Sequence, residues 1–165
     1  MRSIIIIAHN LRSTHNVGSL LRTADGLGVE KVYLTGYTPS PQQVDDVRLP
    51  HIAQKVHRNI SKTALGAEES QPWEQRADIS ALIHELKMQS YTVAALEQWP
   101  TARDISTYKP PAKIALILGR EVEGLEPEVI ERCDIQLVIP MLGSKESFNV
   151  VQAAAMALYH CRFAR

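Results

Sequence analysis

The 165-residue sequence has little that would tie it to a metal, a disulfide framework or a strongly charged partner. Its two cysteines, Cys133 and Cys161, lie far apart, and neither belongs to a Cys-x-x-Cys pair or a Cys/His cluster. This excludes the usual zinc motifs and predicts reduced thiols without a metal site. Lysine plus arginine and aspartate plus glutamate each number 18, so no overall field favours nucleic acid, an anionic membrane or an acidic partner.

Long apolar runs are also missing. The opening MRSIIIIAHN has a basic start and four isoleucines, but it is too short for a signal-peptide core and lacks a small-residue cleavage site. No other stretch is apolar for long enough to span a bilayer. We therefore expect a cytoplasmic protein without membrane contact, and a chain of this length suits one domain over residues 1–165.

Charge is unevenly distributed along the chain. Residues 1–62 hold eight Lys or Arg against four acids, whereas residues 63–132 hold seven against twelve. The densest basic segment is RLPHIAQKVHRNISK, residues 48–62, which contains no acid. It indicates either a phosphate-binding surface or an ordinary solvated face.

Apolar periodicity predicts strands that alternate with helices, which indicates an α/β domain on a mainly parallel sheet with helices on both faces. A ligand site is then expected beyond the carboxyl ends of the strands. Residues 36–62 show no clear periodicity, so we expect a loop with at most a short helix. The predicted strands are 3–8, 31–36, 91–97, 113–119 and 135–140, and the predicted helices are 16–27, 77–89, 120–133 (with Pro127 in its first turn) and 150–158.

The last predicted helix, VVQAAAMAL at residues 150–158, is apolar nearly all the way round. Such a helix is either central in the fold or covered by another subunit. The pattern alone leaves both interpretations open.

Three polar clusters follow predicted strands. In NVGSLLR, Asn16 and Arg22 are fewer than two helical turns apart and are predicted to face one pocket; the alternative is a helix cap and a surface charge. In LGREVEG, Gly119 would let a ligand approach the backbone and Glu121 would be a fixed carboxylate, although a plain turn also explains them. No Lys followed by Ser or Thr completes a phosphate loop there.

The third cluster lies in IPMLGSKESFNVV, where Ser147 and Asn149 either cap the last helix or form a polar wall. Together the patterns N-x-G-x-x-x-R, L-G-x-E-x-x-G and I-P-M-x-G-x-x-x-S-x-N-V occur in this order. They resemble the three motifs of the SpoU, or TrmH-like, branch of the SPOUT RNA methyltransferases, and the similarity runs through nearly the whole chain. Phe148 departs from it, because the family commonly has leucine there.

The resemblance implies a fold and an activity that periodicity could not supply. It implies a single SPOUT methyltransferase domain over residues 1–165 without an RNA-binding extension, a deep trefoil knot near the carboxyl end, and a homodimer whose active site draws on both subunits. General rules treat knots as essentially absent. The implied reaction transfers a methyl group from S-adenosylmethionine to a ribose 2′-hydroxyl of tRNA or rRNA, without a metal.

The resemblance also assigns roles to residues. Arg22 would act on the 2′-hydroxyl as base or as a positioning group, and both roles stay open because a guanidinium with a pKa above about 12 is a poor base. Asn16 and Glu121 would orient it, with Ser147 and Asn149 completing the polar wall. By the same resemblance, the candidate cofactor-binding residues are Leu96, Gly119, Ile139, Met141, Ser147 and Phe148. The candidate RNA-binding residues, Arg12, Arg48, Lys55 and Arg58, come instead from the basic amino-terminal third of the chain.

Three alternatives remain at this point. The first is a nucleotide-binding α/β protein of another class, such as a small oxidoreductase. The second is a knotted RNA-binding protein without catalytic activity, and the third is a related enzyme that methylates a base. Arg22 and the Ser-x-Asn pattern favour the ribose, but the sequence names neither the RNA nor the nucleotide.

Overall fold

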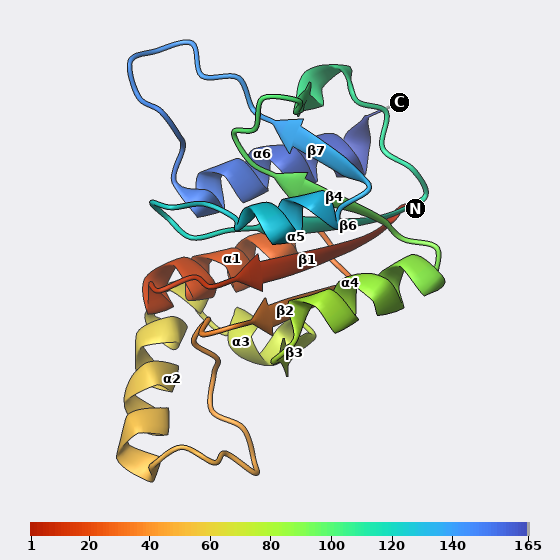
Figure 1. Ribbon diagram of the computed structural model, residues 1–165. Helices are drawn as coiled ribbons and strands as arrows, with labels where there is room; N and C mark the ends of the chain where they lie inside the picture. Colours follow the sequence, from red (N-terminus) through yellow and green to blue (C-terminus); the bar gives the residue numbers. More distant parts are fainter. Residues whose placement is uncertain (165) are drawn as a thin grey trace.

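The computed structural model describes residues 1–164 as one seven-stranded sheet with helices on both faces (Figure 1). The strand order is β3-β2-β1-β6-β4-β7-β5, and the neighbouring strands pair in parallel. The predicted α/β architecture is therefore confirmed. The strands are β1 Ser3–His9, β2 Lys31–Thr35, β3 Trp73–Arg76, β4 Thr92–Leu96, β5 Arg103–Asp104, β6 Lys113–Leu118 and β7 Ile135–Val138. The helices are α1 Thr14–Gly26, α2 Pro50–Ala64, α3 Ala67–Ser70, α4 Ile79–Met88, the short 3-10 helix η1 Ile105–Thr107, α5 Pro127–Glu131 and α6 Val150–Phe163.

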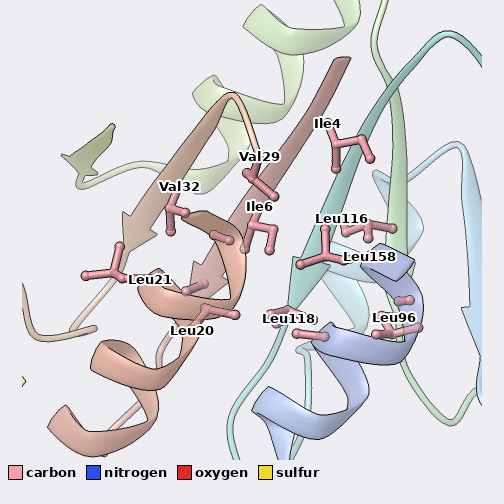
Figure 2. Packing of buried hydrophobic residues seen from close by; sticks show 14 of the residues in the cluster. Ile4, Ile6, Leu20, Leu21, Val29, Val32, Leu96, Leu116, Leu118 and Leu158 are labelled. Atoms are coloured by element: carbon pink, nitrogen blue, oxygen red, sulfur yellow. The ribbon is translucent and has the colours of Figure 1, made fainter. Parts of the chain in front are cut away.

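The interior strand β1 shows why both faces of the sheet are covered. Successive side chains of a strand point to opposite faces, and the four consecutive isoleucines of β1 are all buried. Ile4 and Ile6 pack in the layer formed by α1 and α6 (Figure 2). Ile5 and Ile7 belong to the opposite layer, with residues of α4 and α5. The sheet therefore has a hydrophobic core on each side.

The loop predicted for residues 36–62 is wrong in its second half, because α2 occupies Pro50–Ala64. The buried positions of this helix, Ala53, Ile60 and Ala64, are mostly small and are separated by polar residues, so the apolar stripe is weak in the sequence. The strands β3 and β5 were not predicted either. Both are short and polar, with the sequences WEQR and RD.

The helix predicted over residues 120–133 is confined to α5, Pro127–Glu131. Residues 120–124 instead form a tight turn, in which Arg120 and Gly124 exchange backbone hydrogen bonds of 3.3 and 3.2 Å. Pro127 lies in the first turn of α5, where its fixed φ suits a helix start.

Of the two interpretations that the sequence left open for α6, the structure confirms a central place in the fold for one side of the helix, and cover by another subunit stays a prediction for the other side. Ala157, Leu158 and Cys161 are buried against the sheet. On the other side Tyr159 and Phe163 are exposed, with their ring centroids 4.8 Å apart. One side of α6 is thus core, and the other is an uncovered apolar face.

Both cysteines are buried free thiols. Burial raises the pKa of Cys133 to about 12 and that of Cys161 to about 11, so neither is a ready nucleophile. Among residues 1–164, no three His, Cys, Asp or Glu side chains are grouped as metal ligands. None of the helices in this part of the chain has the length and apolar character needed to cross a membrane.

Candidate functional site

The carboxyl ends of β1, β6, β4 and β7 meet at one edge of the sheet, because these strands are parallel neighbours. A pocket opens at this edge, between the ends of β4 and β6, the segment that follows β7 and the start of α6. Met141 lies outside its lining. The candidate cofactor-binding residues that line it are Leu96, Gly119, Ile139, Ser147 and Phe148.

Beside this pocket, hydrogen bonds join the three motifs. Glu121 lines the pocket and accepts a bond of 3.2 Å from the side-chain amide of Asn16. The side-chain oxygen of Asn16 in turn accepts a bond of 3.4 Å from the amide of Asn149. These two bonds hold together residues that are separated in the sequence by 105 positions (Asn16 and Glu121) and by 133 positions (Asn16 and Asn149).

Helix capping accounts for only part of this arrangement. Ser13, not Asn16, caps α1, because its hydroxyl accepts a bond from the Asn16 backbone N–H. The Asn16 side chain is therefore free to join the other motifs. Asn149 does cap α6, since its side-chain oxygen accepts from the Val151 N–H at 2.9 Å, while its amide nitrogen reaches Asn16.

Glu121 is held as a carboxylate. Burial opposes its ionisation, but bonds donated by its own N–H, by the backbone of Ser13 and Arg12 and by Asn16 outweigh burial and lower its pKa. Hydrogen bonds donated to a carboxylate stabilise its charged form. Glu121 thus fixes the start of α1 against the segment that follows β6.

That segment, GREVEGLE at residues 119–126, is here called the acidic loop. Gly119 was predicted to let a ligand approach the backbone, which stays a prediction, and the chain itself also comes close to this glycine. A Cβ atom there would lie 2.6 Å from the Leu125 N and 2.7 Å from the Gly124 C. Gly124 has a φ of +70°, and a Cβ on it would lie 2.3 Å from the Oε2 of Glu97.

A second polar cluster, at the end of β1, was not predicted. Glu126 accepts a bond of 3.1 Å from Asn10 and lies 3.3 Å from Nε2 of His9 and 3.5 Å from the Arg120 guanidinium. His9 is buried, and its Nδ1 lies 2.8 Å from the Thr35 hydroxyl. Burial lowers the pKa of His9. For Glu126, burial would raise the pKa, but the hydrogen bond from Asn10 and the nearby positive charges outweigh burial and lower it.

Sequence reasoning also passed over Glu97, which lines the pocket and accepts a bond of 2.8 Å from the Leu125 N–H. Its position directly after β4 is the signal that was available, because sites of parallel sheets lie beyond strand ends. His9, the last residue of β1, carries the same signal.

Arg22 lies apart from this cluster within one chain. It is exposed in the second half of α1 and lies outside the pocket lining. Six helical residues turn it about 120° around the axis from Asn16 and move it about 9 Å along it. The structure thus does not bring Arg22 and Asn16 to one face of α1.

The four candidate RNA-binding residues are in different situations. Arg12 pairs with Glu123 at 3.0 Å. Arg48 is bound by Asp46 and by the carbonyl oxygens of residues 40 and 41, each at 3.1 Å or less. Lys55 and Arg58 are exposed on α2.

The family model described as the SpoU rRNA methylase family matches residues 3–159. The chain belongs to that family. It is 30% identical over 157 residues to a Staphylococcus aureus protein named as a TrmH family tRNA/rRNA methyltransferase, an alignment that covers 95% of this chain and 57% of that protein. The chain therefore spans little more than half the length of such relatives.

Solved structures of RNA-modifying enzymes have the same fold. The tRNA modifying enzyme TrmH/SpoU of A. aeolicus superposes with a TM-score of 0.79 at 22% identity, over 98% of this chain and 75% of that one. An AdoMet-bound rRNA methyltransferase of Sinorhizobium meliloti gives 0.79 at 21% identity, over 97% and 56%. A structure described as an RNA 2′-O ribose methyltransferase gives 0.77 at 26% identity, over 96% and 55%. The mainly parallel α/β fold class and the SpoU/TrmH-like branch are confirmed, and the knot stays a prediction.

Proposed function

We propose that this SpoU-family protein is an S-adenosylmethionine-dependent methyltransferase that modifies a ribose 2′-hydroxyl of tRNA or rRNA. Residues 1–165 would supply one SPOUT methyltransferase domain with the knot near its carboxyl end. The observation that carries the proposal is the bonded connection from Glu121 through Asn16 to Asn149, beside the strand-end pocket. The solved 2′-O ribose methyltransferase of similar fold supports the choice of a ribose.

The pocket suits the cofactor chemically. Leu96, Ile139 and Phe148 give it apolar walls, which fit an adenine ring, and backbone groups at the strand ends are available to bind its polar edge. Glu97 and Glu121 also line it, and carboxylates favour a positively charged ligand. When bound, S-adenosylmethionine supplies a methyl group already activated by its sulfonium.

The protein then has two tasks, which are to align the 2′-hydroxyl with that methyl group and to accept or direct its proton. We assign the hydroxyl to Arg22, with Asn16 and Glu121 orienting the groups around it and Ser147 and Asn149 forming the polar wall. The hydrogen bond between Asn16 and Asn149 supports this grouping.

A homodimer would reconcile these roles with the exposure of Arg22. Because Arg22 lies away from the pocket of its own chain, we propose that it completes the site of a second copy. The uncovered face of α6, with Met156, Tyr159 and Phe163, is a suitable contact surface, since exposed apolar patches mark interaction sites. Its helix packs against α1, which carries Arg22.

The test is transfer of labelled methyl from S-adenosylmethionine to unmodified tRNA and rRNA pools, followed by nucleoside analysis. Label in a 2′-O-methylated nucleoside is expected. Label in a base would indicate a base methyltransferase, whereas RNA and cofactor binding without transfer would indicate a silent RNA-binding protein. Either result would overturn the ribose assignment.

Arg22→Ala should lower transfer by about 100-fold or more while cofactor affinity stays unchanged, as expected for loss of a general base or orienting group. Arg22→Lys serves as the companion variant. It should recover much of the rate if Arg22 only positions the ribose, and should shift the pH profile of transfer if Arg22 is the base. Full activity of Arg22→Ala would refute the mechanism.

A further inference from the structure

We propose that one row of side chains on α2 binds the phosphate backbone of the substrate RNA and leads it to the helix that carries Asn16. The row consists of His51, Lys55, Arg58 and Lys62 and is here called the basic stripe. This inference rests on the proposed function, because it states how the RNA of that reaction is held.

The basic stripe is a straight row of basic side chains. Its members are four, three and four residues apart within a single helix, so they fall within an arc of about 60° and extend for about 16 Å along the axis. All four side chains are exposed. The helix contains no acidic residue, so its own sequence does not neutralise the row.

The charges of the basic stripe are also free. Among the ion pairs of residues 1–164 none involves Lys55, Arg58 or Lys62. The Lys62 Nζ donates only to the neutral Asn59, at 3.4 Å. Arg48, by contrast, donates hydrogen bonds to the Asp46 carboxylate and to the carbonyl oxygens of Ser40 and Pro41. An unpaired cation can release the counterions of a nucleic acid, which is the main source of sequence-independent affinity.

The placement of α2 connects the basic stripe to the site. The helix projects from the body of the domain, with its first residues at the far tip and its last turns against α1 (Figure 1). At the crossing, Gly18 lies against the Ile60 carbonyl, where a Cβ would come within 2.2 Å, and the Thr63 hydroxyl donates to the His15 carbonyl at 2.8 Å. Lys62 therefore precedes a residue anchored next to Asn16.

RNA is favoured over a membrane by the other side of the same helix. Ala53, Ile60 and Ala64 are buried, and Ile60 and Ala64 lie where α2 packs against Gly18 of α1. An interfacial membrane helix needs its apolar face free to enter the lipid. Within α2 the one large apolar side chain that is exposed is Ile52. The free surface of the helix is therefore mainly polar and cationic, which suits phosphate contacts that position a nucleic acid without reading its sequence.

The test compares two variants with equal loss of charge. Lys55→Ala/Arg58→Ala removes two members of the basic stripe, and Lys109→Ala/Arg132→Ala removes two exposed cations elsewhere. Binding of an unmodified tRNA transcript is followed by fluorescence anisotropy between about 50 and 200 mM salt. The stripe variant should bind about ten-fold more weakly at low salt, and its log–log salt slope should flatten by about 1.5 to 2. The control should match the wild type.

A charge-preserving variant separates electrostatics from folding. Lys55→Arg/Arg58→Lys should keep wild-type affinity and slope, because a phosphate contact of this kind needs a positive charge and not one particular side chain. Equal slopes for the stripe variant, the control and the wild type would overturn the inference. Equal losses of RNA affinity in the stripe variant and in the control variant would also overturn the inference. Failure of the wild type to methylate RNA would refute the proposed function instead, since the slopes are measured without methyl transfer.

Discussion

The acidic loop and α2 carry opposite charge and use it in opposite ways. The three glutamates of the loop that face the start of the chain are all bonded, with Glu121 on α1, Glu123 on Arg12 and Glu126 on Asn10. The cations of the basic stripe are exposed and unpaired within residues 1–164. Equal numbers of acids and bases therefore conceal a division, in which the glutamates of the acidic loop assemble the site and the cations of the basic stripe remain available to a ligand.

The largest effect is expected where α2 joins the site. Gly18→Ala places a Cβ 2.2 Å from the Ile60 carbonyl and 2.3 Å from the Thr63 hydroxyl. Such overpacking should lower the free energy of unfolding by about 3 kcal/mol, measured by urea denaturation. Gly26→Ala in the same helix meets nothing within 4 Å and should be neutral or stabilising. Equal stabilities for the two variants would contradict the close crossing.

Within the acidic loop, the glutamates should differ from one another. Glu121→Ala leaves the donors of Arg12, Ser13 and Asn16 without their acceptor, which should cost about 2 kcal/mol of unfolding free energy. Glu123→Ala removes only an exposed ion pair and should leave stability within experimental error. The comparison would fail if Glu123→Ala were as destabilising as Glu121→Ala.

Two arginines ten residues apart should separate stability from RNA binding. Arg48→Ala removes bonds to Asp46 and to two carbonyl oxygens and should cost about 1 kcal/mol of stability with unchanged RNA affinity. Arg58→Ala should weaken RNA binding and leave the unfolding curve unchanged. Melting curves and fluorescence anisotropy on the same samples check both predictions. Weaker RNA binding by Arg48→Ala would contradict the assignment of Arg48 to stability alone.

The smallest effect concerns pH. Burial lowers the pKa of His9 from its usual 6.5, against the opposing influence of Glu126 and with the help of Arg120. At a pH between the lowered pKa of folded His9 and 6.5, the unfolded chain binds more protons than the folded protein. The free energy of unfolding that the neutral His9 contributes is therefore complete above about pH 6.5 and decreases as the pH falls. The lowered pKa of Glu126 adds a further loss below 4.5.

Urea midpoints measured from pH 7 downward should therefore fall below about pH 6.5. In His9→Asn this first part of the decline should be reduced. The exposed His84 provides the control, because His84→Asn should retain the wild-type profile. Identical profiles for all three proteins would show that His9 does not carry the effect.

The sequence predicted those parts of the fold that depend on dense apolar runs. Ile4 to Ile7 can only be a strand buried on both faces, and this prediction is confirmed. The helix α2 was not predicted, because its buried side is formed largely by the small residues Ala53 and Ala64. Residues of this size signal a close helix crossing only once the facing Gly18 is known.

The candidate site shows a similar limit. Asn16, Glu121 and Asn149 were grouped through a family resemblance. No local sequence rule pairs residues that are separated by more than 100 positions, as Asn16 is from Glu121 (105 positions) and from Asn149 (133 positions). Composition could not distinguish Arg48 from Arg58 either. The distinction depends on Asp46, whose carboxylate folds back onto Arg48 at 2.8 Å, and on the exposure of Arg58.

The position of β6 in the sheet has a consequence for biosynthesis. Ser3 of β1 pairs with Lys113 of β6, so one edge of the most apolar strand stays unpaired until that later segment has left the ribosome. Open strand edges are prone to wrong pairing in nascent chains. Asn149 emerges later still, which makes the meeting of the three motifs one of the last events of folding. A release of the nascent chain before this point would yield a protein with an exposed β1 edge and no assembled site.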